Sequence, residues 1–162
     1  MSVSVQREAF DVGQEIATLT AGRNAIGAVA SFVGLVREMN AADGAVAGDA
    51  HQVSAMTLEH YPGMTEHALE EIVAEANRRW ALMAVRVIHR FGRLLPGDAI
   101  VLVIVAGAHR GEAFAACEFI MDYLKTRAPF WKKEEGSDET AGARWVEARE
   151  SDETAATRWK DS

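Results

Sequence analysis

The sequence predicts an α+β fold, with a mixed or antiparallel sheet and helices packed mainly on one face. Strand-like and helix-like hydrophobic patterns alternate along the chain in the order strand–helix–strand–strand–helix–strand–strand–helix–strand. The chain has 162 residues, of which 49% are hydrophobic and 25% charged. This size and composition suit one globular domain with its own core, so we expect a single domain over residues 1–162.

The first third of the chain predicts three strands, one helix and one long loop. A strand at Val3–Arg7 precedes a short helix that begins after Asp11, whose side chain can cap it. The apolar run Gly27–Val36 predicts a strand in the centre of the sheet. Residues 38–52 are rich in Ala, Gly, Asp and Asn and predict a mobile loop, and the alternation over Val53–His60 predicts the next strand.

The middle of the chain predicts two long helices and two strands. An apolar stripe predicts a helix over Thr65–Trp80, after the turn residues Tyr-Pro-Gly. Alternation over Ala84–Arg90 predicts a strand, and the almost wholly apolar Ala99–Ala106 predicts a strand buried on both faces. A third helix should follow His109 and end at about Lys125, since the proline at position 129 forbids its continuation.

The C-terminal segment, residues 134–162, is acidic and poor in apolar residues. A short strand is expected at Arg144–Ala148, and we expect the segment to be ordered only in part, through Trp145 and Trp159. The pattern Ser-Asp-Glu-Thr-Ala-x-x-Arg-Trp occurs twice, beginning at Ser137 and Ser151. Two short copies are too few for a repeat fold, so coincidence or a local duplication explains them.

Composition excludes several classes of protein. The formal net charge of −7 argues against general nucleic-acid binding, which needs a broad basic face. The sequence has no apolar run of about 18 residues and no signal-peptide pattern at its start, so we expect a cytoplasmic protein. The one cysteine, Cys117, lies in an alanine-rich helical pattern and is predicted to be a buried core thiol. The five scattered histidines predict no metal site, and no cofactor is expected.

A small basic segment interrupts this acidic chain. Four cations fall within the nine residues from Lys125 to Lys133, and Lys125 and Lys132 flank a proline, a phenylalanine and a tryptophan. Apolar neighbours remove water from an ammonium group, and a dehydrated lysine loses its proton more easily. Such a lysine can attack a carbonyl or move a proton. The alternative is a helix whose terminal cations offset its dipole, followed by a solvated basic loop.

Six segments, in order, resemble one family. They are GAVASFVGLVRE at 27–38, TLEHYPGM at 57–64, VIHRFGRLLPGD at 87–98, AHRGEAF at 108–114, FIMDYLKTRAPFWKKE at 119–134 and RWVEARESD at 144–152. Together they resemble the large, catalytic subunit of molybdopterin synthase, the MoaE family, from Gly27 to Trp159. The chain departs from the family pattern in the loop at 38–52, which is longer than usual, and in the first copy of the repeat.

This resemblance implies an α/β hammerhead fold and a sulfur-transfer reaction. Members of the family convert cyclic pyranopterin monophosphate into molybdopterin by adding two sulfurs. The sulfur arrives as a thiocarboxylate on the C-terminal glycine of a small, ubiquitin-like, MoaD-like subunit, whose C-terminus enters a pocket of the large subunit. Two large subunits form a central homodimer with one small subunit at each end, which makes a heterotetramer.

The resemblance also implies roles for individual residues. By motif position, Lys125 and Lys132 are the catalytic lysines, while Arg37, His109 and Arg110 hold the phosphate and the pterin. Three more residues are candidates for binding the substrate: Phe32, Met121 and Lys133. The chemistry agrees, because the phosphate and the thiocarboxylate are both anions that need cations in a partly dry pocket. Taken singly, each of these cations is equally explained as a solvated surface residue or a helix cap.

The predicted third helix sets a limit on this site. Lys125 lies one turn after Met121 on the apolar side, so its amine should be half buried. Arg110 and Lys125 are 15 residues apart on that helix, which separates them by about 22 Å. A small pterin cannot touch both. If both residues belong to one site, Arg110 must come from a second copy of the chain.

Two other functions stay open on the sequence alone. A different transferase could handle acyl or phosphate groups in the same basic pocket without sulfur. A non-catalytic α+β module could bind an anionic nucleotide or a ubiquitin-like partner. The partner's tail also needs a groove, for which Gly34 and the loop at 38–52 are candidate walls, although an ordinary surface loop explains residues 40–50 equally well.

Overall fold

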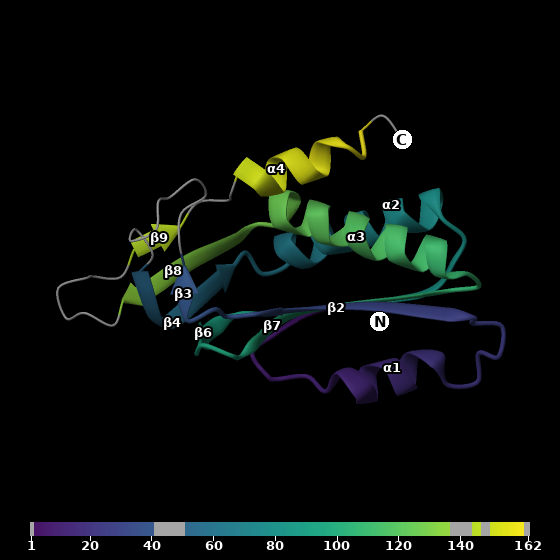
Figure 1. The fold of residues 1–162 in the computed structure, drawn as a ribbon, viewed down its shortest axis with the longest axis horizontal. Coiled ribbons are helices and arrows are strands. Elements are labelled where there is room, and N and C mark those ends of the chain that lie inside the picture. The colour runs from purple at the N-terminus through teal and green to yellow at the C-terminus, as the bar shows by residue number, and fades with distance from the viewer. Residues whose placement is uncertain (1, 41–50, 137–143, 147–149, 161–162) are drawn as a thin grey trace.

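A four-stranded sheet forms the larger part of the computed structural model, which describes residues 2–40, 51–136, 144–146 and 150–160 (Figure 1). In spatial order its strands are β1 (Val3–Gln6), β5 (Leu82–Arg90), β7 (Ala99–Gly107) and β2 (Ala28–Leu35). β1 runs parallel to β5, and the other neighbours are antiparallel. β7 is buried from Val101 to Gly107, which confirms the prediction of a strand covered on both faces.

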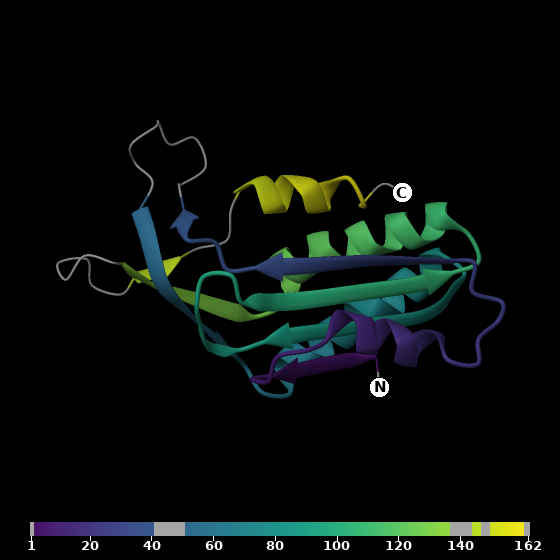
Figure 2. The same cartoon turned by 60° about the horizontal axis from the view of Figure 1, so that its bottom comes forward.

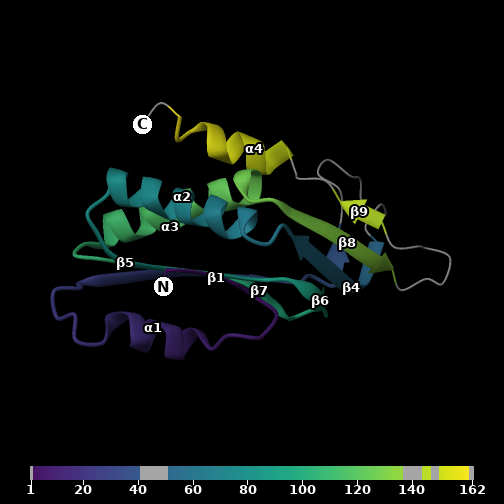
Figure 3. The same ribbon diagram turned by 180° about the vertical axis from the view of Figure 1, so that it is seen from behind.

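Helices cover both faces of this first sheet. α2 (Met64–Arg79) and α3 (Arg110–Arg127) lie side by side on one face, and α1 (Val12–Thr20) lies on the other (Figures 1 and 3). Because strand side chains alternate, Val103 of β7 joins the core under α2 and α3, whereas its neighbour Leu102 joins the core over α1. The expectation of an α+β fold with helices mainly on one face is confirmed.

A second sheet extends from one end of the first (Figure 2). Its strands are β3 (Met39–Asn40), β4 (His51–His60), β8 (Phe130–Gly136) and β9 (Arg144–Val146) in spatial order, with β6 (Gly92–Leu94) paired to β4. The pairing of β4 with β8 is antiparallel and aligns Leu58 with Lys132. β8 therefore brings the basic segment onto a sheet.

A C-terminal helix, α4 (Glu150–Thr157), packs along α3 (Figure 1). After it, the Trp159 ring meets the rings of Trp80 and Phe119 edge-to-face, with centroids 5.8 and 5.6 Å apart. Trp159 thus anchors the acidic segment as predicted, but β8 and α4 were not predicted. The side chain of Trp145, in β9, lies outside the described part.

One prediction about this framework is wrong, and one strand was not predicted. Gly27–Val36 was expected to form a central strand, but β2 lies at the edge of its sheet and exposes Val29, Phe32, Val33 and Leu35. An apolar run in the sequence does not show whether its side chains are covered by other parts of the same chain. No element was predicted for the segment after Pro129, where the alternative reading had a solvated basic loop, yet pairing with β4 makes it a strand despite its charges.

The long loop predicted at 38–52 is only partly described. Its ends belong to β3 and β4, and residues 41–50 lie outside the described part. Gly34, a candidate groove wall, has a packing role instead: a Cβ there would lie 2.7 Å from a methyl carbon of Val101. Among the helices of the described residues, none combines the length and apolar character needed to cross a bilayer.

Candidate functional site

A groove of about 440 Å³ lies between β2, α3 and α4. Three of the residues predicted for the site, Phe32, Met121 and Lys125, line it together. The rest of its lining comes from the same three elements: Ala30, Ser31, Phe114, Cys117, Glu118, Asp122 and Asp152. The groove therefore joins an apolar floor to one cation and three carboxylates.

Lys125 lies in the last turn of α3, and its side chain is 49% exposed, close to the predicted half burial. Its Nζ forms an ion pair with Asp152 Oδ1 of α4 at 3.2 Å. α4 is held in this position because the side chains of Arg158 and Trp159 both donate hydrogen bonds to Asp122 of α3, at 2.8 and 2.7 Å. The amine is thus paired with a carboxylate and is not surrounded by apolar groups alone.

Lys132 lies in β8, and its side chain is 30% exposed. Its Nζ contacts Glu134 Oε1 at 2.9 Å, and the side chain of Glu134 is only 2% exposed. A buried carboxylate needs such a partner, so this pair fixes both side chains. Sequence analysis missed Glu134. The signal was its spacing of two from Lys132, which places both side chains on one face of a strand, but no strand was predicted for this segment.

The four other predicted cations lie away from this groove. Arg37 follows β2, His109 precedes α3 and Arg110 begins it; all three are exposed, and within the described part of the chain their side chains form no hydrogen bond or ion pair. Lys133 follows Lys132 on β8, so its side chain points to the opposite face. α3 is one continuous helix, which keeps Arg110 about 22 Å from Lys125 within one chain.

A buried cluster of rings supports the start of β8. The ring of His89, from β5, stacks on Phe130 with ring centroids 3.7 Å apart. The ring centroid of His60 lies 6.5 Å from that of Phe130. Burial lowers the pKa of His89 to about 4, so its ring is neutral and can donate from Nδ1 to the carbonyl of Arg90 at 2.9 Å. β8 is therefore anchored in the core just before its lysines.

The cysteine in the groove wall is a core residue, as predicted. Cys117 is buried on α3, and burial raises the pKa of its thiol to about 11, so it is protonated near neutral pH. Within the residues that the structure describes, no three His, Cys, Asp or Glu side chains converge as a set that could hold a metal ion. Among the residues that line the groove, Lys125 is the one amine.

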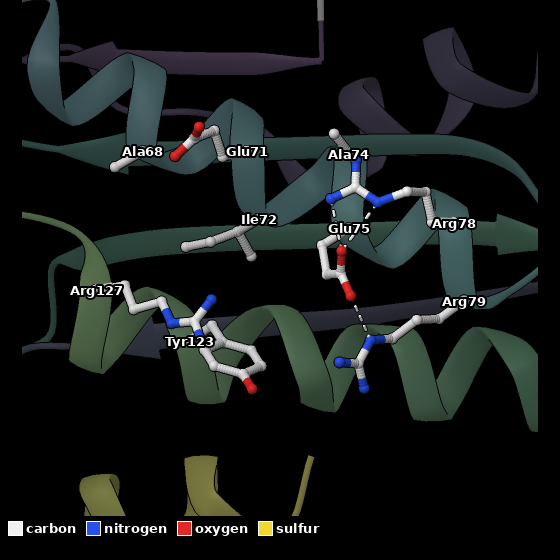
Figure 4. Close-up of a pocket in the computed structure, with 9 residues that line it drawn as sticks. All are labelled: Ala68, Glu71, Ile72, Ala74, Glu75, Arg78, Arg79, Tyr123 and Arg127. Atoms are coloured by element: carbon white, nitrogen blue, oxygen red, sulfur yellow. Dashed lines mark hydrogen bonds and ion pairs between the residues drawn. The ribbon is translucent and has the colours of Figure 1, made fainter. Parts of the chain in front are cut away.

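A second groove, of about 430 Å³, lies between α2 and α3 (Figure 4). Here Arg127 stacks 3.8 Å above the ring of Tyr123, and Glu75 bonds to both Arg79 and Arg78. These hydrogen bonds, from Arg79 first, lower the pKa of Glu75 below its usual value. Arg127 follows Lys125 by two residues, about 200° around the helix, so it faces this second groove and not the first.

Comparisons with known proteins show which family the chain belongs to. The model of the family described as MoaE protein matches residues 5–127. The chain is 61% identical to the molybdopterin synthase catalytic subunit of Ralstonia nicotianae over 83% of this chain and 72% of that protein. It is 55% identical to the same subunit of Pseudomonas aeruginosa over 85% of this chain and 87% of that protein.

Solved structures give the same result. A molybdopterin biosynthesis MoaE protein from Burkholderia ambifaria superposes with a TM-score of 0.79 at 52% identity, covering 98% of this chain and 97% of that one. Molybdopterin synthase from Staphylococcus aureus superposes with a TM-score of 0.74 at 29% identity, covering 88% and 95%. The chain belongs to the MoaE family of molybdopterin synthase catalytic subunits.

Proposed function

We propose that this chain transfers sulfur from the C-terminal thiocarboxylate of a small ubiquitin-like subunit to cyclic pyranopterin monophosphate, and so forms the dithiolene of molybdopterin. The observation that carries the proposal is the groove in which Lys125 meets Phe32 and Met121; Lys132 does not line it, but follows Lys125 by seven residues, on β8. We propose that the full length acts as one catalytic domain in the cytoplasm.

The lysines supply the chemistry. In our proposal the thiocarboxylate sulfur attacks a pterin carbon that carries oxygen. The carbon–oxygen bond breaks, the oxygen leaves with a proton supplied by an ammonium group, and the sulfur then joins that carbon to the terminal glycine as a thioester. Lys125 replaces its ion pair with Asp152 by a hydrogen bond to the carbonyl oxygen of that glycine, which stabilises the charge that develops there. Water, or the amine of Lys125 in a transient acyl link, then cleaves the carbon–sulfur bond to glycine and leaves sulfur on the substrate. Lys132 acts as the second cation or as a proton donor.

A second copy of the chain completes the site in this proposal. Arg110 and His109 cannot reach Lys125 in their own chain, yet their side chains are exposed and without a polar partner among the described residues. β2 presents an unpaired apolar edge beside Phe114. Two copies that meet along this edge around a two-fold axis place their α3 helices antiparallel. Each Arg110 then approaches the Lys125 of the other copy, where it can bind the substrate's phosphate with Arg37.

The small subunit is the other partner we propose. A solved assembly from Helicobacter pylori is described as a complex of subunits 1 and 2 of molybdopterin-converting factor, and its chain shares the present fold with a TM-score of 0.63 at 20% identity. The proposal that this chain takes such a partner rests on its membership of the family and on the positions of its lysines.

The test is a turnover assay with cyclic pyranopterin monophosphate and a thiocarboxylated small subunit. Lys125→Ala and Lys132→Ala should each lower kcat by at least about 100-fold, because each removes a cation that acts on the reacting atoms. Lys160→Ala is the matched control, since Lys160 is an exposed lysine beyond α4 and should leave kcat unchanged within about twofold.

The same assay separates the alternatives. Full turnover by both lysine variants would contradict the proposal. A wild type that shows no turnover, together with lysine variants that lose binding of the small subunit, would favour the non-catalytic module. Mass spectrometry of the wild type adds a second criterion, because only sulfur transfer predicts a link between one of these lysines and the partner's terminal glycine.

A further inference from the structure

Three guanidinium groups line the groove between α2 and α3, which we name the arginine groove: those of Arg78, Arg79 and Arg127 (Figure 4). Its lining also contains two carboxylates, Glu71 and Glu75, so the cations outnumber the anions by three to two. Its volume of about 430 Å³ falls within the range of sites that hold small molecules. The arginine groove therefore has the size and the charge to hold a small anion.

A buried hydroxyl group in this groove has no hydrogen-bond partner. Tyr123 lines the groove and is only 3% exposed, yet among the residues that the structure describes its hydroxyl forms no hydrogen bond. In Figure 4 its ring lies between the guanidinium groups of Arg127 and Arg79. Buried tyrosine hydroxyls usually have a partner, because removing a polar group from water without one costs free energy. A ligand in the groove supplies the missing partner.

The guanidinium groups also keep free donors. Arg127 lies over the Tyr123 ring, 3.8 Å from its centroid, and donates no hydrogen bond within the described part of the chain. Arg79 donates to Glu75 and to the carbonyl of Trp159, both at 2.8 Å, and so uses two of its five N–H groups. Several charged donors thus face one groove with their bonding capacity unfilled.

Two neighbouring rings hold these donors in place. The rings of Phe119 and Tyr123 meet with centroids 4.6 Å apart. Arg79 lies over the Phe119 ring, 4.8 Å from its centroid, as Arg127 lies over that of Tyr123. Donors fixed in this way lose little conformational freedom when they bind a ligand.

We propose that the arginine groove binds a phosphate monoester of a small organic group. The three terminal oxygens of a tetrahedral phosphate can accept from Tyr123, Arg79 and Arg127 at once, in different directions. A carboxylate has only two coplanar oxygens, and Glu75 already fills that role for Arg78. The organic group lies along the apolar part of the lining, which consists of Ala68, Ile72 and Ala74.

This site is separate from the groove of Lys125. Tyr123 and Arg127 lie two residues before and after Lys125 on α3, each about 200° around the helix from it, so the helix stands between the two grooves. The inference therefore does not rest on the proposed function, and its test reads out Tyr123 and not turnover.

Nuclear magnetic resonance of the full chain with ¹³C-labelled tyrosine tests the proposal. The chain has only two tyrosines, so each gives its own signals, and Tyr61→Phe assigns them. Titration with inorganic phosphate or adenosine monophosphate should shift the signals of Tyr123 to saturation and leave those of Tyr61, which is exposed and outside the groove, in place. The ester should bind at least about fivefold more tightly than inorganic phosphate, because its organic group is buried as well. Chloride at equal ionic strength is the control for screening.

An arginine variant tests the cation. Arg127→Gln should weaken binding of adenosine monophosphate by at least about tenfold, because it removes a charge-assisted hydrogen bond. Arg7→Gln is the matched control. Arg7 is also an exposed guanidinium over a ring, 4.6 Å from the centroid of Phe91, but it does not line the groove, so its variant should bind within about twofold of wild type.

Tyr123→Phe tests the hydroxyl, since it removes one oxygen and keeps the ring. Calorimetry should show adenosine monophosphate binding weakened by about five- to tenfold, with Arg110→Ala in both proteins so that the phosphate site assigned to Arg110 does not contribute. The ligand-free variant should unfold at the same urea concentration as its parent or a higher one, because the hydroxyl bonds to nothing there. Unchanged Tyr123 signals, equal shifts with chloride, equal affinity for the ester and inorganic phosphate, or a Tyr123→Phe variant that is less stable and binds normally would each overturn the inference.

Discussion

The two sheets of this protein are stabilised by different interactions. The first sheet is built from apolar strands, and β7, one of its two inner strands, is buried from Val101 to Gly107. The second sheet contains β8, whose sequence is FWKKEEG and whose side chains are mostly half buried. Hydrophobic burial explains the first sheet, whereas backbone pairing with β4 and the ion pair of Lys132 with Glu134 explain the second. The first sheet should therefore carry the stability, and the second should hold Lys132 in place.

The largest expected effect lies in the core of the first sheet. Phe119 is fully buried and meets the rings of Trp80, Tyr123 and Trp159 edge-to-face. Phe119→Ala should lower the free energy of unfolding by about 3–5 kcal/mol, through lost burial and a cavity. Urea unfolding at constant protein concentration measures this. Leu95→Ala, at an exposed apolar position, should cost less than about 1 kcal/mol, and equal losses for the two variants would contradict the comparison.

The two sheets meet where His89 of β5 stacks on Phe130 of β8, and this contact should make the stability of the protein depend on pH. Burial holds the folded-state pKa of His89 at about 4, below its usual 6.5, so the unfolded chain binds a proton more readily between these values. Stability is then fully present above pH 6.5 and falls as the pH drops toward 4. From pH 7.5 to 5.0 this residue should account for a loss of about 2 kcal/mol.

Unfolding of a His89→Gln variant over the same range checks this effect. The variant is less stable at pH 7.5 because it loses the stacking on Phe130, but its stability should depend on pH less than that of the wild type. His67→Gln is the control, since His67 is exposed and pairs only with Glu71 on α2. If His89→Gln keeps the pH dependence of the wild type, this contact does not cause it.

The smallest expected effect tests whether two copies of the chain meet along β2, the open edge of the first sheet, and share one site. Lys125→Ala and Arg110→Ala chains should each be inactive as homodimers, but after mixing at equal amounts and reassociation they should regain about a quarter of wild-type activity. Half of the dimers are then mixed, and each mixed dimer has one intact site of two. Activity that stays at the level of the separate variants would mean that the two residues act within one chain.

The sequence predicted the elements whose own side chains determine them. The apolar run of β7, the stripe of α3 and the turn before α2 all depend on local patterns, and all are present. The groove side of Lys125 also followed from its position one turn after Met121. These features need no knowledge of distant residues.

The features that sequence reasoning missed depend on distant partners. β8 becomes a strand because β4, some 70 residues earlier, offers an edge for its charged residues. Asp152 reaches Lys125 only because α4 folds back along α3, and that helix is only eight residues long and has no large apolar side chain by which to recognise it. β2 was placed in the centre because its exposed apolar side chains resemble buried ones in sequence. Patterns along the chain record burial, but not which molecule provides it.

The continuous α3 also constrains how the length of this chain can vary. One inserted residue between Arg110 and Lys125 would turn everything after it by about 100° and move it by about 1.5 Å. Lys125 would then leave the groove, and the connection to β8 would start from the wrong side. Viable insertions or deletions in this helix must come in whole turns, so its length sets the distance between Arg110 and Lys125, the two residues that we propose meet across a dimer.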